Sequence, residues 1–428
     1  MYRRSTLLGA LLAAQCVAMT GVAAAAAVDP AMEEIMRRLA ALERQNQELT
    51  LQVEALQQQN GTLRGRQDAQ RATLQEATPP MLTHEKSDDW TSRIRVKGDI
   101  RFRHENIDVE ALPEDRTRET LRARFGAAIK LTDSMNGEIA FASGGNDPRG
   151  GSATLGAASS RKDIGLDLAY MSWRPFEGAV VTAGKMRQPF VRPGLSAFFD
   201  NEIRPEGVAI GYKSARGVFG SAFRFWLEER SVHADSMLSG VQAGWESTFA
   251  GMQIRAGAGY YDYGSVQGRF PGFGDGVVNQ LGNTIIGAGA DVRYAYDYNI
   301  GQLFAEASFP FGALPLSVFA DYARNSEADS GLDTAWNLGV LVGNADQPGR
   351  WEAGVLAQHV EKDALFGQWV DSDFAGGVTD NSGQVYRVAW MAMKSLLVNV
   401  TYLDTAFNVD VGAETDYTRW QLDFNFMF

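Results

Sequence analysis

Apolar and polar residues alternate along the last twelve residues of the chain, which read YTRWQLDFNFMF. One parity holds Thr418, Trp420, Leu422, Phe424, Phe426 and Phe428, and the other holds Tyr417, Arg419, Gln421, Asp423, Asn425 and Met427. Successive side chains of a strand point to opposite faces, so this segment would have one aromatic or aliphatic face and one mostly polar face. Because the chain ends on apolar residues, the pattern favours a strand that faces lipid.

The same alternation appears in the two segments that follow the N-terminal region, at residues 92–105 and 119–131. One face of each segment is apolar, with Ile94, Val96, Ile100 and Phe102 in the first and Leu121, Phe125, Ile129 and Leu131 in the second. The opposite face is basic, with Arg93, Arg95, Lys97, Arg101, Arg103, Arg122, Arg124 and Lys130. Charges cannot face hydrocarbon, so we expect these eight cations to line water or to pair with acids inside a barrel.

Further strands are predicted at 138–143, 164–174, 180–185, 208–213, 218–227, 237–249, 253–263, 296–309, 316–324, 334–342, 351–360, 385–393, 396–407 and 417–428. With the first two, these make about sixteen. Short turns alternate with long connections at 144–163, 189–207, 264–295 and 361–384, as expected for short periplasmic turns and long external loops. The predicted fold is an all-β, antiparallel transmembrane barrel, wide enough at sixteen strands to enclose an aqueous channel.

The connection at 189–207 is the candidate for a constriction inside such a barrel. It carries three phenylalanines beside the charged residues Arg192, Asp200, Glu202, Arg204 and Glu206. Folded inward, its acids would face the basic residues of the first two strands and create a transverse field that sorts ions. The alternative is an external loop whose charges are solvated, and the sequence leaves both open.

The N-terminal region has a different pattern. Arg3, Arg4, an apolar stretch at 6–14 and an alanine-rich stretch at 22–27 predict a signal peptide over 1–27. A lipoprotein anchored at Cys16 is the disfavoured alternative, because Gln15 stands where a small residue is expected. Cys16 is the only cysteine, so the mature chain would hold no disulfide and no thiolate ligand.

Heptad spacing follows over residues 28–75 and predicts a coiled coil. The core positions are Ile35, Leu39, Leu42, Asn46, Leu49, Val53, Leu56, Asn60 and Leu63. The two asparagines fall at a-type positions, where a polar residue fixes register at a cost in stability. The heptads alone do not distinguish two chains from three. Residues 76–91 read as a linker, and 92–428 as the barrel.

Composition excludes several functional classes. The net charge of −12 argues against a nucleic-acid partner, which needs a dense basic surface. The four histidines have no metal-ligand spacing, and no nucleophile elbow surrounds Ser382 or Ser395. The acidic stretch at 361–380 begins like a calcium loop, but Ala375 lacks an oxygen ligand, so a solvated external loop is expected. We therefore predict no catalytic residue, no cofactor and no metal site.

Two segments resemble a known family. Residues 184–212 (GKMRQPFVRPGLSAFFDNEIRPEGVAIGY) and 360–383 (VEKDALFGQWVDSDFAGGVTDNSG) are similar to the Gram-negative "putative porins", as are the leading coiled coil and the terminal phenylalanine. These features are also similar to those of the phosphate-selective O and P porins. The resemblance implies a trimeric channel in the outer membrane, in contact with lipid and lipopolysaccharide, with its coiled coil in the periplasm.

The expected function is passive diffusion of small hydrophilic solutes or ions. The crowded cations suggest an anion preference, including phosphate, although the net charge and the acids of the 189–207 loop oppose it. The alternative is a structural or adhesive protein whose barrel is an anchor and whose coiled coil contacts the cell wall.

Overall fold

Sixteen long antiparallel strands form a closed barrel in the computed structural model, which describes residues 90–272, 278–312 and 314–428. Their bounds are β1 (Ile94–Val109), β2 (Arg116–Lys130), β3 (Met135–Ser143), β5 (Ile164–Trp173), β6 (Ala179–Lys185), β7 (Glu206–Lys213), β8 (Val218–Glu228), β9 (Ser236–Phe249), β10 (Met252–Gly264), β13 (Tyr298–Phe311), β14 (Leu314–Asn325), β15 (Thr334–Gly343), β16 (Trp351–Val360), β17 (Asn381–Met393), β18 (Leu396–Phe407) and β19 (Thr415–Met427). The predicted all-β barrel of about sixteen strands is confirmed.

Short elements lie within the long connections and directly before β1. The strand β4 (Ala153–Thr154) adds to β2, while β11 (Ile285–Ile286) and β12 (Arg293–Tyr294) form a pair of their own. The 3₁₀ turns are η1 (Trp90–Arg93), η2 (Gly289–Asp291), η3 (Gly367–Trp369) and η4 (Phe374–Gly376). Among the described residues, no helix is both long and apolar enough to cross a membrane.

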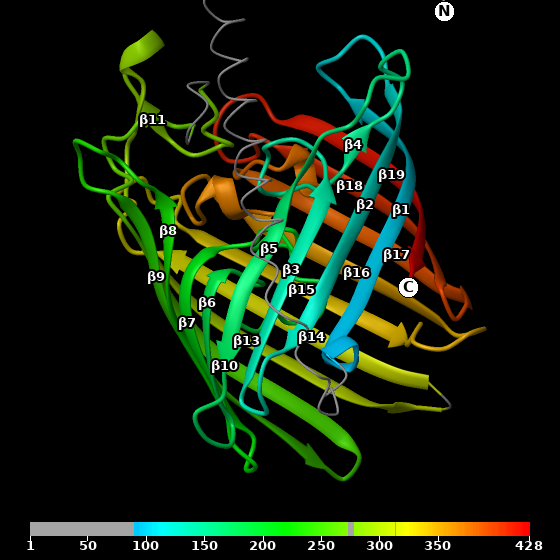
Figure 1. Cartoon of the computed structure of the whole chain (residues 1–428). Helices are drawn as coiled ribbons and strands as arrows, with labels where there is room; N and C mark the ends of the chain where they lie inside the picture. Colours follow the sequence, from blue (N-terminus) through cyan, green and yellow to red (C-terminus); the bar gives the residue numbers. More distant parts are fainter. Residues whose placement is uncertain (1–89, 273–277, 313) are drawn as a thin grey trace, which may run out of the picture. The chain divides into compact units, whose positions relative to one another are not determined.

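The first and last strands close the barrel. β1 pairs with β2 on one side and with β19 on the other, and Figure 1 shows β1 in blue beside β19 in red. The Phe428 carbonyl accepts a hydrogen bond from the Gly98 amide at 3.0 Å, and the Phe428 amide donates one to the Gly98 carbonyl at 3.0 Å. The long connections gather at one end of the barrel and the short turns at the other (Figure 1). These ends are called the long-loop end and the short-turn end below.

Strand alternation divides the barrel into an apolar outside and a charged inside. On the outer face, Val96, Phe125 and Trp420 keep 54%, 56% and 50% of their surface exposed. On the inner face, Arg103 and Arg122 keep only 6% and 7%. The outer belt therefore suits a lipid environment, while the inner face is covered by other parts of the chain.

Two connections fill part of the interior: the first lumen loop, residues 186–205 between β6 and β7, and the second lumen loop, residues 361–380 between β16 and β17. They bond to each other directly, since the Asp200 amide donates to the Trp369 carbonyl at 2.8 Å and the Asp371 amide to the Ala197 carbonyl at 3.3 Å. The expectation that the acidic stretch 361–380 is a solvated external loop is wrong. Asp363 and Asp380 are fully buried, because apolar residues of the same stretch draw it into the core.

Candidate functional site

Five of the eight predicted lumen cations lie on the inner face of β1 and β2, where three of them share acids in one network and two pair with separate acids. Arg101 stands opposite Arg122 in the ladder, and Asp99 stands opposite Arg124. The Asp99 carboxylate accepts from Arg122 Nη2 at 2.8 Å and from Arg124 Nε at 2.7 Å. The Lys97 ammonium pairs with Glu138 of β3 at 2.9 Å. Each cation of this wall therefore has an acid beside it, which is how charges are tolerated at a buried site.

The other three predicted cations lie away from this part of the inner face. Arg93 belongs to η1 and is exposed, and Arg95 is exposed near the start of β1. Lys130 ends β2, where its ammonium pairs with Asp133 of the next turn at 2.6 Å. All three lie at the short-turn end, so they line a mouth of the barrel rather than its middle.

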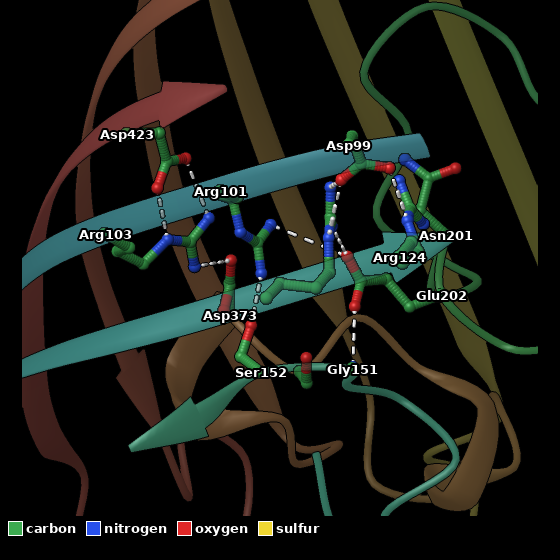
Figure 2. Close-up of polar contacts among 12 residues, drawn as sticks. Asp99, Arg101, Arg103, Arg124, Gly151, Ser152, Asn201, Glu202, Asp373 and Asp423 are labelled. Carbon is green, nitrogen blue, oxygen red and sulfur yellow. Dashed lines mark hydrogen bonds and ion pairs between the residues drawn. The ribbon is translucent and has the colours of Figure 1, made fainter. Parts of the chain in front are cut away.

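The first lumen loop brings an acid against the basic wall. The Glu202 carboxylate forms ion pairs with Arg122 and, at 3.5 Å, with Arg101, and its Oε2 accepts from the Gly151 amide at 2.9 Å. Figure 2 shows Glu202 pointing toward Arg101 and the backbone of Gly151. Burial raises the pKa of Glu202, but Arg122 and Arg101 outweigh it and lower the pKa to about 2. Glu202 is therefore a fixed anion at neutral pH.

The remaining predicted loop residues have different surroundings. The Arg192 guanidinium donates to the Phe199 carbonyl at 2.7 Å and to Asn201, and burial lowers its pKa. Arg204 lies 3.5 Å from Asp167, and burial lowers its pKa as well. Glu206 is outside the loop: it opens β7, is largely exposed and pairs with Lys185 at 2.8 Å.

Asp200 joins the two lumen loops without a cationic hydrogen-bond partner. Its side chain accepts from the Glu202 amide at 2.7 Å and from the Ser372 amide at 2.9 Å. Burial, followed by the negative charge of Asp371, raises the pKa of Asp200 to about 8. Burial and the neighbouring Asp373 likewise raise the pKa of Asp371 to about 6. These two carboxyl groups are therefore the ones at the junction whose charge we expect to change near neutral pH.

Asp373 fastens the second lumen loop to the barrel wall. Its carboxylate pairs with Arg103 of β1 at 2.9 Å and with Arg419 of β19 at 3.0 Å. Arg103 also donates to Asp423 at 2.6 and 2.9 Å, and Arg419 donates from Nε to Glu105 at 2.9 Å. We call the ion pairs of Asp373 with Arg103 and Arg419 the Asp373 clamp, and the sequence analysis did not predict it. The available signal was that Arg419 and Asp423 share the polar parity of the last strand, together with the apolar residues that flank Asp373.

The first lumen loop also contacts the opposite side of the interior. Phe190 packs against Phe223 of β8 and Tyr261 of β10, both with ring centroids 5.5 Å apart, and Phe199 packs against Tyr261 at 5.2 Å. The Ser196 hydroxyl donates to Asp321 of β14 at 2.8 Å. The loop therefore reaches from the charged wall at β1 and β2 to an aromatic wall at β8 and β10.

An open cavity of about 670 Å³ lies at the short-turn end of the barrel. Its charged lining comes from Lys213, Arg216, Glu246, Arg255 and Glu306. Both signs of charge are present, and Arg255 lies within 3.3 Å of Glu246 and 3.6 Å of Glu306. Over the described ranges, no group of three or more histidine, cysteine or acidic residues is placed to hold a metal ion.

Comparison with known proteins is consistent with this geometry. Residues 107–273 match the family model described as "Putative porin", whereas the curated proteins give no match. The structure of OprB from Pseudomonas putida at high pH is 12% identical, with a TM-score of 0.55, over 79% of this chain and 95% of that chain.

Two further structures cover 78% of this chain. A mutant of the Rhodopseudomonas blastica porin is 12% identical over 100% of its own length, with a TM-score of 0.45. A loop-deletion mutant of OmpT from Vibrio cholerae is 13% identical over 99% of its own length, with a TM-score of 0.46. The suspected resemblance is therefore confirmed: the chain is similar in sequence to the "Putative porin" family over residues 107–273, and its barrel has the fold of a porin.

Proposed function

We propose that this protein is an outer-membrane porin that lets small hydrophilic solutes and ions diffuse passively. The observation that carries the proposal is a closed sixteen-strand barrel with an apolar outer belt and a charged inner face. A barrel of this width has room for an aqueous channel, and charges inside it are stable only beside water or counter-charges. The two lumen loops then act as the constriction that limits solute size.

The orientation in the membrane is inferred from the difference between the two ends of the barrel. We place the short-turn end in the periplasm and the long-loop end outside, with lipid and lipopolysaccharide around the barrel. The predicted signal peptide and the coiled coil over 28–75 lie outside the described residues. They remain part of the proposal, as does a homotrimer held together by that coil in the periplasm.

A modest anion preference is the finer part of the proposal. Four guanidinium groups, those of Arg101, Arg122, Arg124 and Arg204, stand among three carboxylates, those of Asp99, Glu202 and Asp167. The pairing leaves a small positive excess, so the preference should be weaker than the eight cations of the sequence suggest. Ions crossing the narrowest part pass through this local field.

The selectivity test measures the reversal potential of the purified full chain in a planar bilayer under a KCl gradient. We expect a potential directed toward the chloride equilibrium value in the wild type, and a shift toward zero or toward potassium in a double variant carrying R122Q and R124Q. K130Q is the matched control, because its charge lies at the short-turn mouth, and it should leave the potential unchanged. An unchanged potential in the double variant would refute the anion preference, and a folded but silent barrel would favour the structural or adhesive alternative.

A further inference from the structure

Glu202 occupies a carboxylate-binding site built by other parts of the chain. The basic wall supplies Arg122 and Arg101, and the connection after β3 supplies the Gly151 amide, which donates to Glu202 Oε2 at 2.9 Å. Figure 2 shows Arg101 and the backbone of Gly151 on different sides of the Glu202 carboxylate. Two guanidinium groups and a backbone N–H form a donor set that suits a carboxylate, whichever molecule carries it. We call this set the Glu202 cradle.

Arg101 has donors that Glu202 does not use. Its Nη2 donates to Ser152 at 2.7 Å, its Nη1 stays 3.5 Å from Glu202, and its Nε is buried without an acceptor. A guanidinium has five N–H donors, and leaving them unmet at a buried site is costly. The neighbouring Arg103 is different, because it makes three hydrogen bonds of 2.6 to 2.9 Å to Asp423 and Asp373.

The cradle is not fully enclosed by the surrounding residues. Glu202 and Arg101 keep 16% and 15% of their side-chain surface exposed, more than the fully enclosed acid Glu105 on the same wall. Nearby, Arg204 has a second buried Nε that makes no hydrogen bond. A solute anion arriving here would meet unsatisfied donors and a local excess of positive charge.

We propose that the Glu202 cradle is a binding site for carboxylate-bearing solutes, in which a solute carboxylate exchanges with that of Glu202. The inference rests on the porin function proposed above, because the solute must enter the barrel lumen. In this arrangement Glu202 is an internal competitor held at high effective concentration, so it weakens solute binding and speeds release. A transport site needs such weak binding, since a tightly held solute would not leave.

The test measures how succinate, added to one side of a planar bilayer, reduces the KCl current through the full chain. Its neutral diamide, succinamide, serves as the control solute. In E202Q the internal competitor is gone while an amide oxygen remains for the Gly151 N–H. We expect the succinate concentration that halves the current to be at least about tenfold lower for E202Q than for the wild type. E246Q removes the same charge from the short-turn end and should behave as the wild type does.

A second variant keeps the test decisive if E202Q does not fold, which the heat-dependent mobility of the barrel on gels would reveal. R101Q should lose the succinate block while Glu202 stays paired with Arg122. Equal block of wild type and E202Q, equal block by succinamide, or block by inorganic phosphate as strong as by succinate would each overturn the carboxylate site. Conducting channels with no response to succinate would refute this inference alone, whereas a folded barrel that does not conduct would refute the porin function.

Discussion

Buried charges on the wall formed by β19, β1 and β2 are stable because each has an opposite partner within hydrogen-bond reach. Asp373 of the second lumen loop joins this wall, since two guanidinium groups from the first and last strands share its carboxylate. Burial raises the pKa of Asp373, but Arg419 and Arg103 outweigh it and hold the pKa well below its ordinary value. The residue is therefore a permanent anion that ties the second lumen loop to the wall.

Replacing this carboxylate should destabilise the loop. In Asp373→Asn, Arg103 and Arg419 keep their other acids but lose a charged acceptor, so we expect the free energy of unfolding to fall by about 2 kcal/mol. Urea unfolding of the barrel in lipid vesicles measures this change. Asp346→Asn is the control, because the Asp346–Arg350 pair is exposed and worth at most about 1 kcal/mol. Equal effects of the two variants would contradict the clamp.

Asp200 should make the junction of the two loops depend on pH. An aspartate in an unfolded chain ionises near pH 3.9, whereas in the folded protein the pKa of Asp200 is about 8. Between these two pH values the folded state holds a proton that the unfolded state has lost. The stabilisation that Asp200 gives the folded state is therefore fully present below about pH 4 and is lost as pH rises through 8. We expect current fluctuations to increase between pH 7 and 9. Asp200→Asn cannot ionise, so fluctuations that persist with the same pH dependence in that variant would refute the role of Asp200.

At the scale of elements, the lumen loops are held by aromatic packing as much as by charge. Phe198 is fully buried in the cluster that joins the first lumen loop to the aromatic wall. A phenylalanine in such a place contributes through its buried area and its close packing. The loop therefore behaves as part of the core rather than as a mobile connection.

Truncating that anchor should loosen the constriction. Phe198→Ala is expected to cost about 3 kcal/mol of unfolding free energy and to raise single-channel conductance, because the loop can then move toward one wall. Val232→Ala, in the exposed connection between β8 and β9, should change stability by less than about 0.5 kcal/mol and leave conductance as in the wild type. A Phe198→Ala channel with wild-type conductance would show that the first lumen loop does not limit the pore.

Strand alternation made most of the barrel predictable from sequence. The predicted strands at 351–360 and 396–407 coincide with β16 and β18. With a period of two residues, only one register places every apolar side chain of a strand on the face that meets lipid. The same alternation predicted that the side chains of Arg101, Arg103 and Arg122 point into the barrel. Loop placement was not, because the apolar residues of 361–380 follow no regular period, and Asp373 meets Arg103 across 270 residues.

At the scale of the whole molecule, the interior has a charged wall along β19, β1 and β2 and an aromatic wall along β8 and β10, with the lumen loops between them. Each loop contacts the charged wall, through Glu202 in one and Asp373 in the other. The first loop also packs against the aromatic wall, and the second does so through Trp369 and Phe366. The proposed channel would run between these two walls beside the loops, and a narrow polar passage of that kind favours small hydrophilic solutes over large or apolar ones.

The most direct test of this architecture is the single-channel conductance of the purified full chain in a planar bilayer at high KCl. An aqueous passage narrowed by the two loops predicts discrete, stable conductance steps, and larger steps when residues 364–378 of the second lumen loop are deleted. The heat-dependent mobility on gels shows whether the barrel is folded. If both the wild type and the deletion variant are folded and neither conducts, the proposal that this protein is a channel is contradicted.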